Sequence, residues 1–118
     1  MRRLSQNFVR SEFACKCECG FDTVDAELIR VLEVVRRYYG RPVIIHSGCR
    51  CSRYNRDVGG VSASQHLLGK AADFRVMGIG LSEVEDYLDR KYPGQLGMGT
   101  YSGFIHIDVR NGYARWSE

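Results

Sequence analysis

At positions 64–73 the chain reads Ser-Gln-His-Leu-Leu-Gly-Lys-Ala-Ala-Asp, and the other elements are organised around this segment. Its histidine, His66, lies at the end of a polar, turn-prone run. Its aspartate, Asp73, opens the segment Asp-Phe-Arg-Val, which is typical of a buried β-strand. Between them, Gly69 permits a tight reversal because it carries no Cβ. The stretch therefore predicts a loop that returns into a strand and brings the His66 imidazole near the Asp73 carboxylate.

A second strand-like segment, Phe-Ile-His-Ile-Asp-Val at 104–109, carries another histidine. Side chains alternate between the two faces of a strand, so His106 and Asp108 share one face. Together with His66 and Asp73, His106 makes a set of two nitrogen ligands and one oxygen ligand. Three protein ligands and one open position are typical of a catalytic zinc site. A histidine in an apolar strand is also a common core residue, and the spacing alone leaves both interpretations open.

Composition and length predict a single domain over residues 1–118. The chain is 44% hydrophobic and 26% charged, which is ordinary for a globular protein. Its net charge of +3 favours an anionic partner such as a cell-wall polymer. Neither a clustered basic helix nor a basic stretch interleaved with aromatic residues is present, so no nucleic-acid partner is expected. We expect a monomer.

No apolar run approaches the length of a membrane span, so no membrane partner is expected. The chain begins with Met1-Arg2-Arg3, but polar residues follow where a signal peptide would need its apolar stretch. No export signal is therefore recognised, and the sequence leaves the localisation open.

Five cysteines are many for this length, and they fall in two groups. Cys15, Cys17 and Cys19 lie in an irregular N-terminal arm over residues 1–23, and Cys49 and Cys51 lie after the first expected strand. They predict a structural tie between the arm and that loop. The tie can be disulfides in an oxidising compartment, or a second, thiolate-bound zinc if the chain stays reduced. The odd count leaves at least one thiol outside any intrachain disulfide.

The remaining pattern predicts helices packed on a small, largely antiparallel sheet, which is the α+β class. A helix is expected from a cap at Asp22 or Thr23 to Gly40, because apolar residues recur there at helical spacing. Further helices are expected around 54–56 and from 81 to Pro93. The expected strands are 43–46, 73–76, 95–101, 104–109 and 113–116.

An ordered set of short motifs extends from about Phe8 to Trp116. They are Ser-Gly-Cys-Arg at 47–50, Tyr54-Asn55, Val-Gly-Gly at 58–60, the spaced residues Ser64, His66, Gly69, Ala71 and Asp73, and His106-x-Asp108. In this order they resemble the zinc D-alanyl-D-alanine peptidases, specifically a small single-domain branch related in fold to the hedgehog signalling domain. The resemblance implies a hedgehog-like and DD-peptidase-like α+β fold.

The resemblance also implies roles for individual residues. Zinc would be held by His66, Asp73 and His106. Arg50 would face the active site and hold the substrate carbonyl or the developing oxyanion, although an arginine outside this motif would read as a surface salt bridge. Ser64 would bind substrate or orient a ligand, and Tyr54 would belong to the substrate-binding residues.

One position departs from the family pattern. Many members carry Glu or Asp three residues before the last histidine, as the group that takes the proton of the attacking water, and this chain has Gly103 there. Asp108 is the nearest remaining candidate for that catalytic role. Its competing role is to accept a hydrogen bond from a ligating imidazole and fix its orientation. A carboxylate from a distant loop is a third alternative.

The function implied by the resemblance is a zinc metallopeptidase acting on peptidoglycan stem peptides or crossbridges. It would be a D,D- or L,D-carboxypeptidase or an endopeptidase, of the kind found among phage lysis and tail-associated proteins. The alternative is a domain that binds zinc and recognises or assembles on the cell wall without catalysis, which Gly103 favours.

Overall fold

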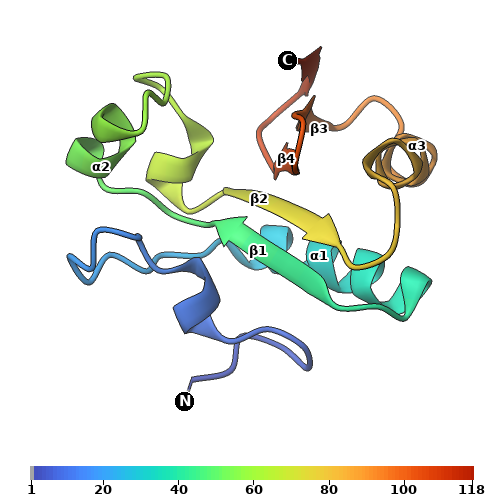
Figure 1. Ribbon diagram of the computed structural model, residues 1–118, viewed down its shortest axis with the longest axis horizontal. Coiled ribbons are helices and arrows are strands. Elements are labelled where there is room, and N and C mark those ends of the chain that lie inside the picture. Colours follow the sequence, from blue (N-terminus) through green and yellow to red (C-terminus); the bar gives the residue numbers. More distant parts are fainter. Residues whose placement is uncertain (1) are drawn as a thin grey trace.

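Eight regular elements and two short 3-10 helices make up the fold of the computed structural model, which describes residues 2–118 (Figure 1). The α-helices are α1 (Ala26–Tyr39), α2 (Ser52–Asp57) and α3 (Leu81–Lys91). The strands are β1 (Val43–Ser47), β2 (Ala71–Val76), β3 (Leu96–Thr100), β4 (Ile105–Asp108) and β5 (Tyr113–Ser117). The 3-10 helices are η1 (Arg10–Phe13) and η2 (Gln65–Leu68).

The five strands form one sheet in the order β1-β2-β4-β3-β5. All neighbours are antiparallel except β3 and β5, which run parallel. The chain leaves β4, passes to the other side of β3 and reverses once more, so β5 takes the direction of β3. The predicted α+β class and the largely antiparallel sheet are confirmed.

Helix α1 closes one face of the sheet and lies beneath β1 and β2 (Figure 1). Its Leu28, Leu32 and Val35 are buried, at the helical spacing that the sequence predicts. Gly40 ends the helix in the left-handed conformation, at φ 63°, as expected. The predicted cap was wrong, because the N-cap is Asp25, whose carboxylate accepts the Glu27 N–H at 2.8 Å.

The cap lies later than expected because the preceding residues are held by the stretch around Gly69. The Asp25 N–H donates to the Gly69 carbonyl at 2.9 Å. A Cβ on Gly69 would come within 2.4 Å of the Thr23 carbonyl oxygen, so Thr23 packs closely against this turn. The start of α1 and the loop that carries His66 are therefore fixed to each other.

Strand alternation separates the core from the opposite face of the sheet. Ala72, Phe74 and Val76 of β2 are buried toward α1, and so are Ile105 and Ile107 of β4. The residues between them in sequence must then point to the other face. Asp73, His106 and Asp108 lie on that second face.

The N-terminal arm packs on α1 without forming a regular element apart from η1. Phe8 and Phe13 are buried in the core and contact each other edge to face. The buried Glu33 carboxylate of α1 accepts hydrogen bonds from the Ser5 hydroxyl at 2.5 Å and from the Asn7 backbone N–H at 2.8 Å. The buried phenylalanines and the hydrogen bonds to Glu33 thus hold the first half of the arm against α1 and the core.

Among residues 2–118, no helix has the length and apolar character needed to cross a membrane.

Candidate active site

Two neighbouring strands and one 3-10 helix bring the candidate ligands together. Asp73 of β2 and His106 of β4 are directly paired across the strands. His66 lies on η2, where the Ser64 hydroxyl accepts its backbone N–H at 3.1 Å. Gly69 then takes a left-handed conformation, at φ 68°, and turns the chain into β2.

The three side chains converge on one carboxylate oxygen. His66 Nε2 lies 3.2 Å and His106 Nδ1 lies 3.0 Å from Asp73 Oδ1. A tetrahedral zinc ion bound to nitrogen and oxygen ligands at about 2.1 Å would separate such ligands by about 3.4 Å. All three side chains are buried, and their ligand atoms lie within 4.8 Å of one another. The donor set and its spacing fit a zinc ion.

Hydrogen bonds on the far sides of the rings orient both histidines. His66 Nδ1 donates to the Gly48 carbonyl at 2.5 Å, which leaves Nε2 free for a metal. His106 Nε2 donates to Asp108 at 2.7 Å, which leaves Nδ1 free. The free nitrogens therefore face the same point beside Asp73. This pairing of ligating histidines with outer acceptors is typical of metal centres.

Asp108 lies on the opposite side of the His106 ring from Asp73. Its side chain is fully buried, and the Arg110 guanidinium donates a hydrogen bond to each of its two oxygens at 2.7 Å. Burial alone would raise the pKa of the Asp108 carboxyl, but the hydrogen bonds from Arg110 and His106 outweigh it and hold that pKa below its ordinary range. The sequence leaves two roles open for Asp108. This geometry favours orientation of the His106 imidazole over acceptance of a proton from water.

Asp73 is stabilised as a carboxylate by its neighbours. Burial opposes its ionisation, but the neighbouring side chains of His106 and His66 outweigh burial and hold the pKa of the Asp73 carboxyl well below its usual range. Its second oxygen pairs with the Arg50 guanidinium at 3.2 Å. Arg50 is held in turn by Asn55 at 3.2 Å and by Ser47 at 3.4 Å. Arg50 therefore lies inside the site and not in a surface salt bridge.

An open cleft of about 590 Å³ gives access to the three ligands. Ser64 and Arg50 line it, as the resemblance implies. Tyr54 does not line it. This residue lies on α2, where its backbone N–H donates to Cys51 Sγ at 3.4 Å, and its substrate-binding role stays a prediction from the resemblance.

Four lining residues have roles that the sequence does not reveal: Tyr101, Arg110, Trp116 and Glu118. The parallel pairing of β5 with β3 sets Trp116 opposite Gly99. Trp116 Nε1 donates to the Tyr101 hydroxyl at 2.9 Å, and Tyr101 stacks on Phe104. The sequence predicts a strand over residues 113–116, but only its pairing with β3 places Trp116 beside the site.

Gly99 makes room for this aromatic wall. A Cβ there would come within 2.1 Å of Trp116 Nε1. We expect Gly99→Ala to displace the indole, break its bond to Tyr101 and destabilise the fold by about 1–3 kcal/mol. Trp116 is the one tryptophan of the sequence, so its fluorescence emission should shift to the red. Gly103→Ala is the matched control, because no atom lies within 4 Å of its added Cβ; equal spectra for both variants would contradict the steric argument.

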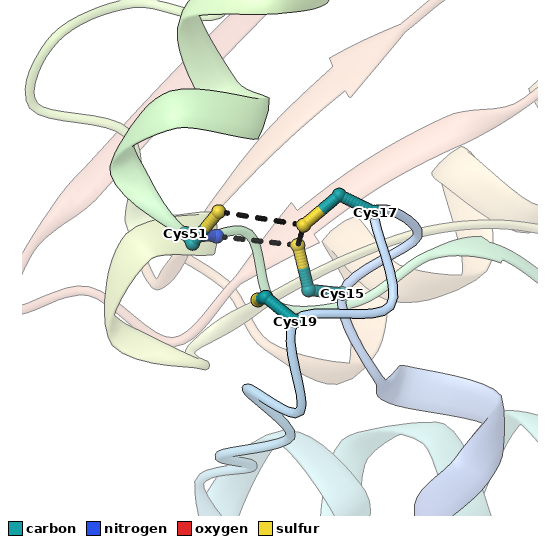
Figure 2. A group of neighbouring side chains, drawn as sticks. All are labelled: Cys15, Cys17, Cys19 and Cys51. Carbon is teal, nitrogen blue, oxygen red and sulfur yellow. Dashed lines mark hydrogen bonds between the residues drawn. The ribbon is translucent and has the colours of Figure 1, made fainter.

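The five cysteines separate into a cluster of four and one outlier. Cys15, Cys17 and Cys19 lie on one loop of the arm and face Cys51 at the start of α2 (Figure 2). Cys49 is buried elsewhere, and its thiol donates to the Phe21 carbonyl at 3.0 Å. Burial raises the pKa of the Cys49 thiol to about 11. The predicted tie between the arm and the loop after β1 thus involves four cysteines.

The fold and the three converging donors define a class: a small α+β protein with a buried cluster, open to a cleft, that fits a metal ion. Residues 6–108 match the sequence model of the peptidase M15 family, which is most of the chain. The chain therefore belongs to the peptidase M15 family, whose members are zinc D-Ala-D-Ala carboxypeptidases and their relatives. The resemblance stated above is confirmed. A search of curated proteins found no match.

Proposed function

We propose that this protein is a zinc peptidase that hydrolyses peptide bonds in the stem peptides or crossbridges of peptidoglycan. The observation that carries the proposal is the convergence of His66 Nε2, Asp73 Oδ1 and His106 Nδ1 in the lining of an open cleft. Membership of a zinc peptidase family supports the same ion and the same reaction class. A D,D- or L,D-carboxypeptidase and an endopeptidase all fit this site, as does a phage lysis or tail-associated protein.

The chain's own residues supply binding and orientation around the ion. His66, Asp73 and His106 would hold a zinc ion, which would supply a Lewis acid and a water of lowered pKa, about 7. The guanidinium of Arg50 has five N–H donors. Three of them bind Ser47, Asn55 and Asp73. The remaining donors are available to the carbonyl oxygen of a substrate, where negative charge develops. Arg50 would thus orient Asp73 and stabilise the oxyanion.

We assign the proton-accepting role to Glu118. Besides Asp73, it is the one carboxylate among the described residues that line the cleft. Its backbone N–H continues the β5 pairing by donating to Thr100 at 3.0 Å. Because side chains alternate along a strand, Glu118 shares the face of Trp116, which is the face of the site. Asp108 is bound on both oxygens and lies behind the His106 ring, so it orients the ligand instead.

The second candidate function is a zinc-binding domain that recognises the cell wall without cleaving it. The observation in its favour is Gly103, where many relatives carry the acidic residue. Nothing lies within 4 Å of a Cβ built on Gly103, so the space that an acidic side chain would occupy at this position is open.

The experiment that separates the two functions is digestion of purified peptidoglycan, with mass spectrometry of the released fragments. A zinc peptidase releases D-alanine or cuts a crossbridge, and the fragment masses identify the bond. Activity should disappear on treatment with a chelator and return with zinc. Binding to the wall polymer with zinc present but no released fragment would favour the recognition domain. A protein without zinc would contradict both.

A further inference from the structure

We propose that Cys15, Cys17, Cys19 and Cys51 form a second zinc site, closed by four thiolates, which fixes the loop carrying Arg50. No residue of this cluster lines the cleft. The proposal goes beyond the peptidase function and does not depend on it. It names four of the five cysteines and excludes Cys49.

The spacing of the sulfurs is that of ligands around one ion. Cys15 Sγ lies 3.5 Å from Cys17 Sγ, and Cys17 Sγ lies 3.6 Å from Cys51 Sγ. Sulfurs bound tetrahedrally to zinc at about 2.3 Å are separated by about 3.8 Å. A disulfide requires an S–S distance of about 2.05 Å. All four sulfurs lie within 4.8 Å of one another, so they gather around a point and do not pair.

The backbone of the arm bends to produce this arrangement. Alternate residues of an extended chain share a face but lie roughly 6.6 Å apart. Here a turn brings them together: the Glu18 N–H donates to the Cys15 carbonyl at 3.1 Å, and Glu18 adopts a left-handed φ of 64°. A left-handed conformation is unfavourable for a residue with a side chain. An ion that binds all three cysteines would compensate for that cost.

Backbone N–H groups already point at two of the sulfurs. The Cys51 N–H donates to Cys15 Sγ at 3.4 Å, and the Tyr54 N–H donates to Cys51 Sγ at 3.4 Å. Hydrogen bonds of this kind around the ligands of a metal orient them and stabilise their negative charge. Four thiolates in tetrahedral arrangement select zinc, or iron, over the hard cations.

The site would hold the loop that forms one wall of the cleft. The Cys49 N–H donates to the Phe13 carbonyl at 2.9 Å, and the Arg50 N–H donates to the His66 carbonyl at 3.0 Å. Gly48 accepts from His66 Nδ1. Cys51 comes directly after Arg50, so a zinc ion at Cys51 fastens this loop to the arm on its outer side. The thiolate zinc thus positions Arg50 from outside the cleft.

The test is the zinc content of the full chain purified under reducing conditions, measured by native mass spectrometry. We expect two zinc ions per chain in the wild type and in Cys49→Ser, and one in Cys19→Ser. Cys49→Ser is the matched control, because it makes the same chemical change at the cysteine outside the cluster. Asp73→Asn should keep the thiolate ion and lose the other, which separates failure of one site from failure of the other.

A second measurement does not depend on the folding of a variant. Cobalt loaded into the wild type should give the intense sulfur-to-metal charge-transfer absorption of thiolate ligands, which nitrogen and oxygen ligands do not produce. In a separate measurement on the variant, hydrogen exchange at the Cys49 and Arg50 amides should be faster in Cys19→Ser than in the wild type. Two zinc ions retained in Cys19→Ser, iron in place of zinc, or an intact mass showing disulfides among these cysteines would overturn the proposal.

Discussion

Asp73→Asn is expected to abolish both zinc binding at the histidine site and peptide release from peptidoglycan. His66 Nε2 and His106 Nδ1 both contact Asp73 Oδ1, and the other oxygen of Asp73 pairs with Arg50. A neutral amide of the same size keeps the packing but removes the charge that attracts the ion. Because a catalytic metal contributes several kcal/mol to stabilising the transition state, kcat/KM should fall by at least about 10³-fold.

The measurement is zinc content together with the rate of fragment release, for the variant and the wild type side by side. Asp86→Asn is the matched control, since it makes the same change on the exposed face of α3. The thermal transition of both variants establishes that they fold. An Asp73→Asn protein that kept its histidine-site zinc and cleaved at the wild-type rate would rule out this carboxylate as a ligand.

Asp108→Asn is expected to weaken zinc binding about 10- to 100-fold, the usual effect of changing the partner of a ligating histidine. The asparagine can still accept from His106, but it no longer carries the charge that Arg110 and His106 share. At saturating zinc, kcat should recover most of its value, because in our assignment Asp108 touches neither substrate nor water.

Glu118→Gln is the companion variant that tests the other half of the assignment. It should keep the wild-type zinc affinity and lower kcat about 10²- to 10⁴-fold, the usual contribution of a general base. The opposite pattern, with normal zinc affinity and low kcat in Asp108→Asn and no effect in Glu118→Gln, would make Asp108 the proton acceptor.

The sequence pointed to the three candidate ligands more directly than to the residues around them. A glycine turn and strand alternation are local properties, so His66, Asp73 and His106 stand out as candidates within a few consecutive residues each. Their spacing left a core role open as well, and the resemblance to a zinc peptidase family singled out the set. The cap of α1 was misplaced for a nonlocal reason: Thr23 and Asp25 are bound by the turn at Gly69, more than forty positions away in the printed sequence.

The cysteines show the same limit. Their spacing predicted a tie between the arm and the loop after β1, and it left both disulfides and a metal ion as alternatives. Which four of them gather depends on where the arm crosses that loop. That crossing is set by Phe13, whose backbone lies so close to Gly48 that a Cβ on Gly48 would come within 2.6 Å of it. Packing of this kind leaves no trace in residue spacing.

From its sequence alone, the chain shows its α+β class, the order of its helices and strands, and His66, Asp73 and His106 as candidate metal ligands. These follow from periodicity, capping residues and turn residues, which act over short distances along the chain. Only the tertiary structure decided which nitrogen of each histidine is free, that Arg110 holds Asp108, and that Trp116 and Glu118 reach the cleft. Each of these depends on strand register and on the parallel return of β5 beside β3, and both are set by packing between residues far apart in the sequence.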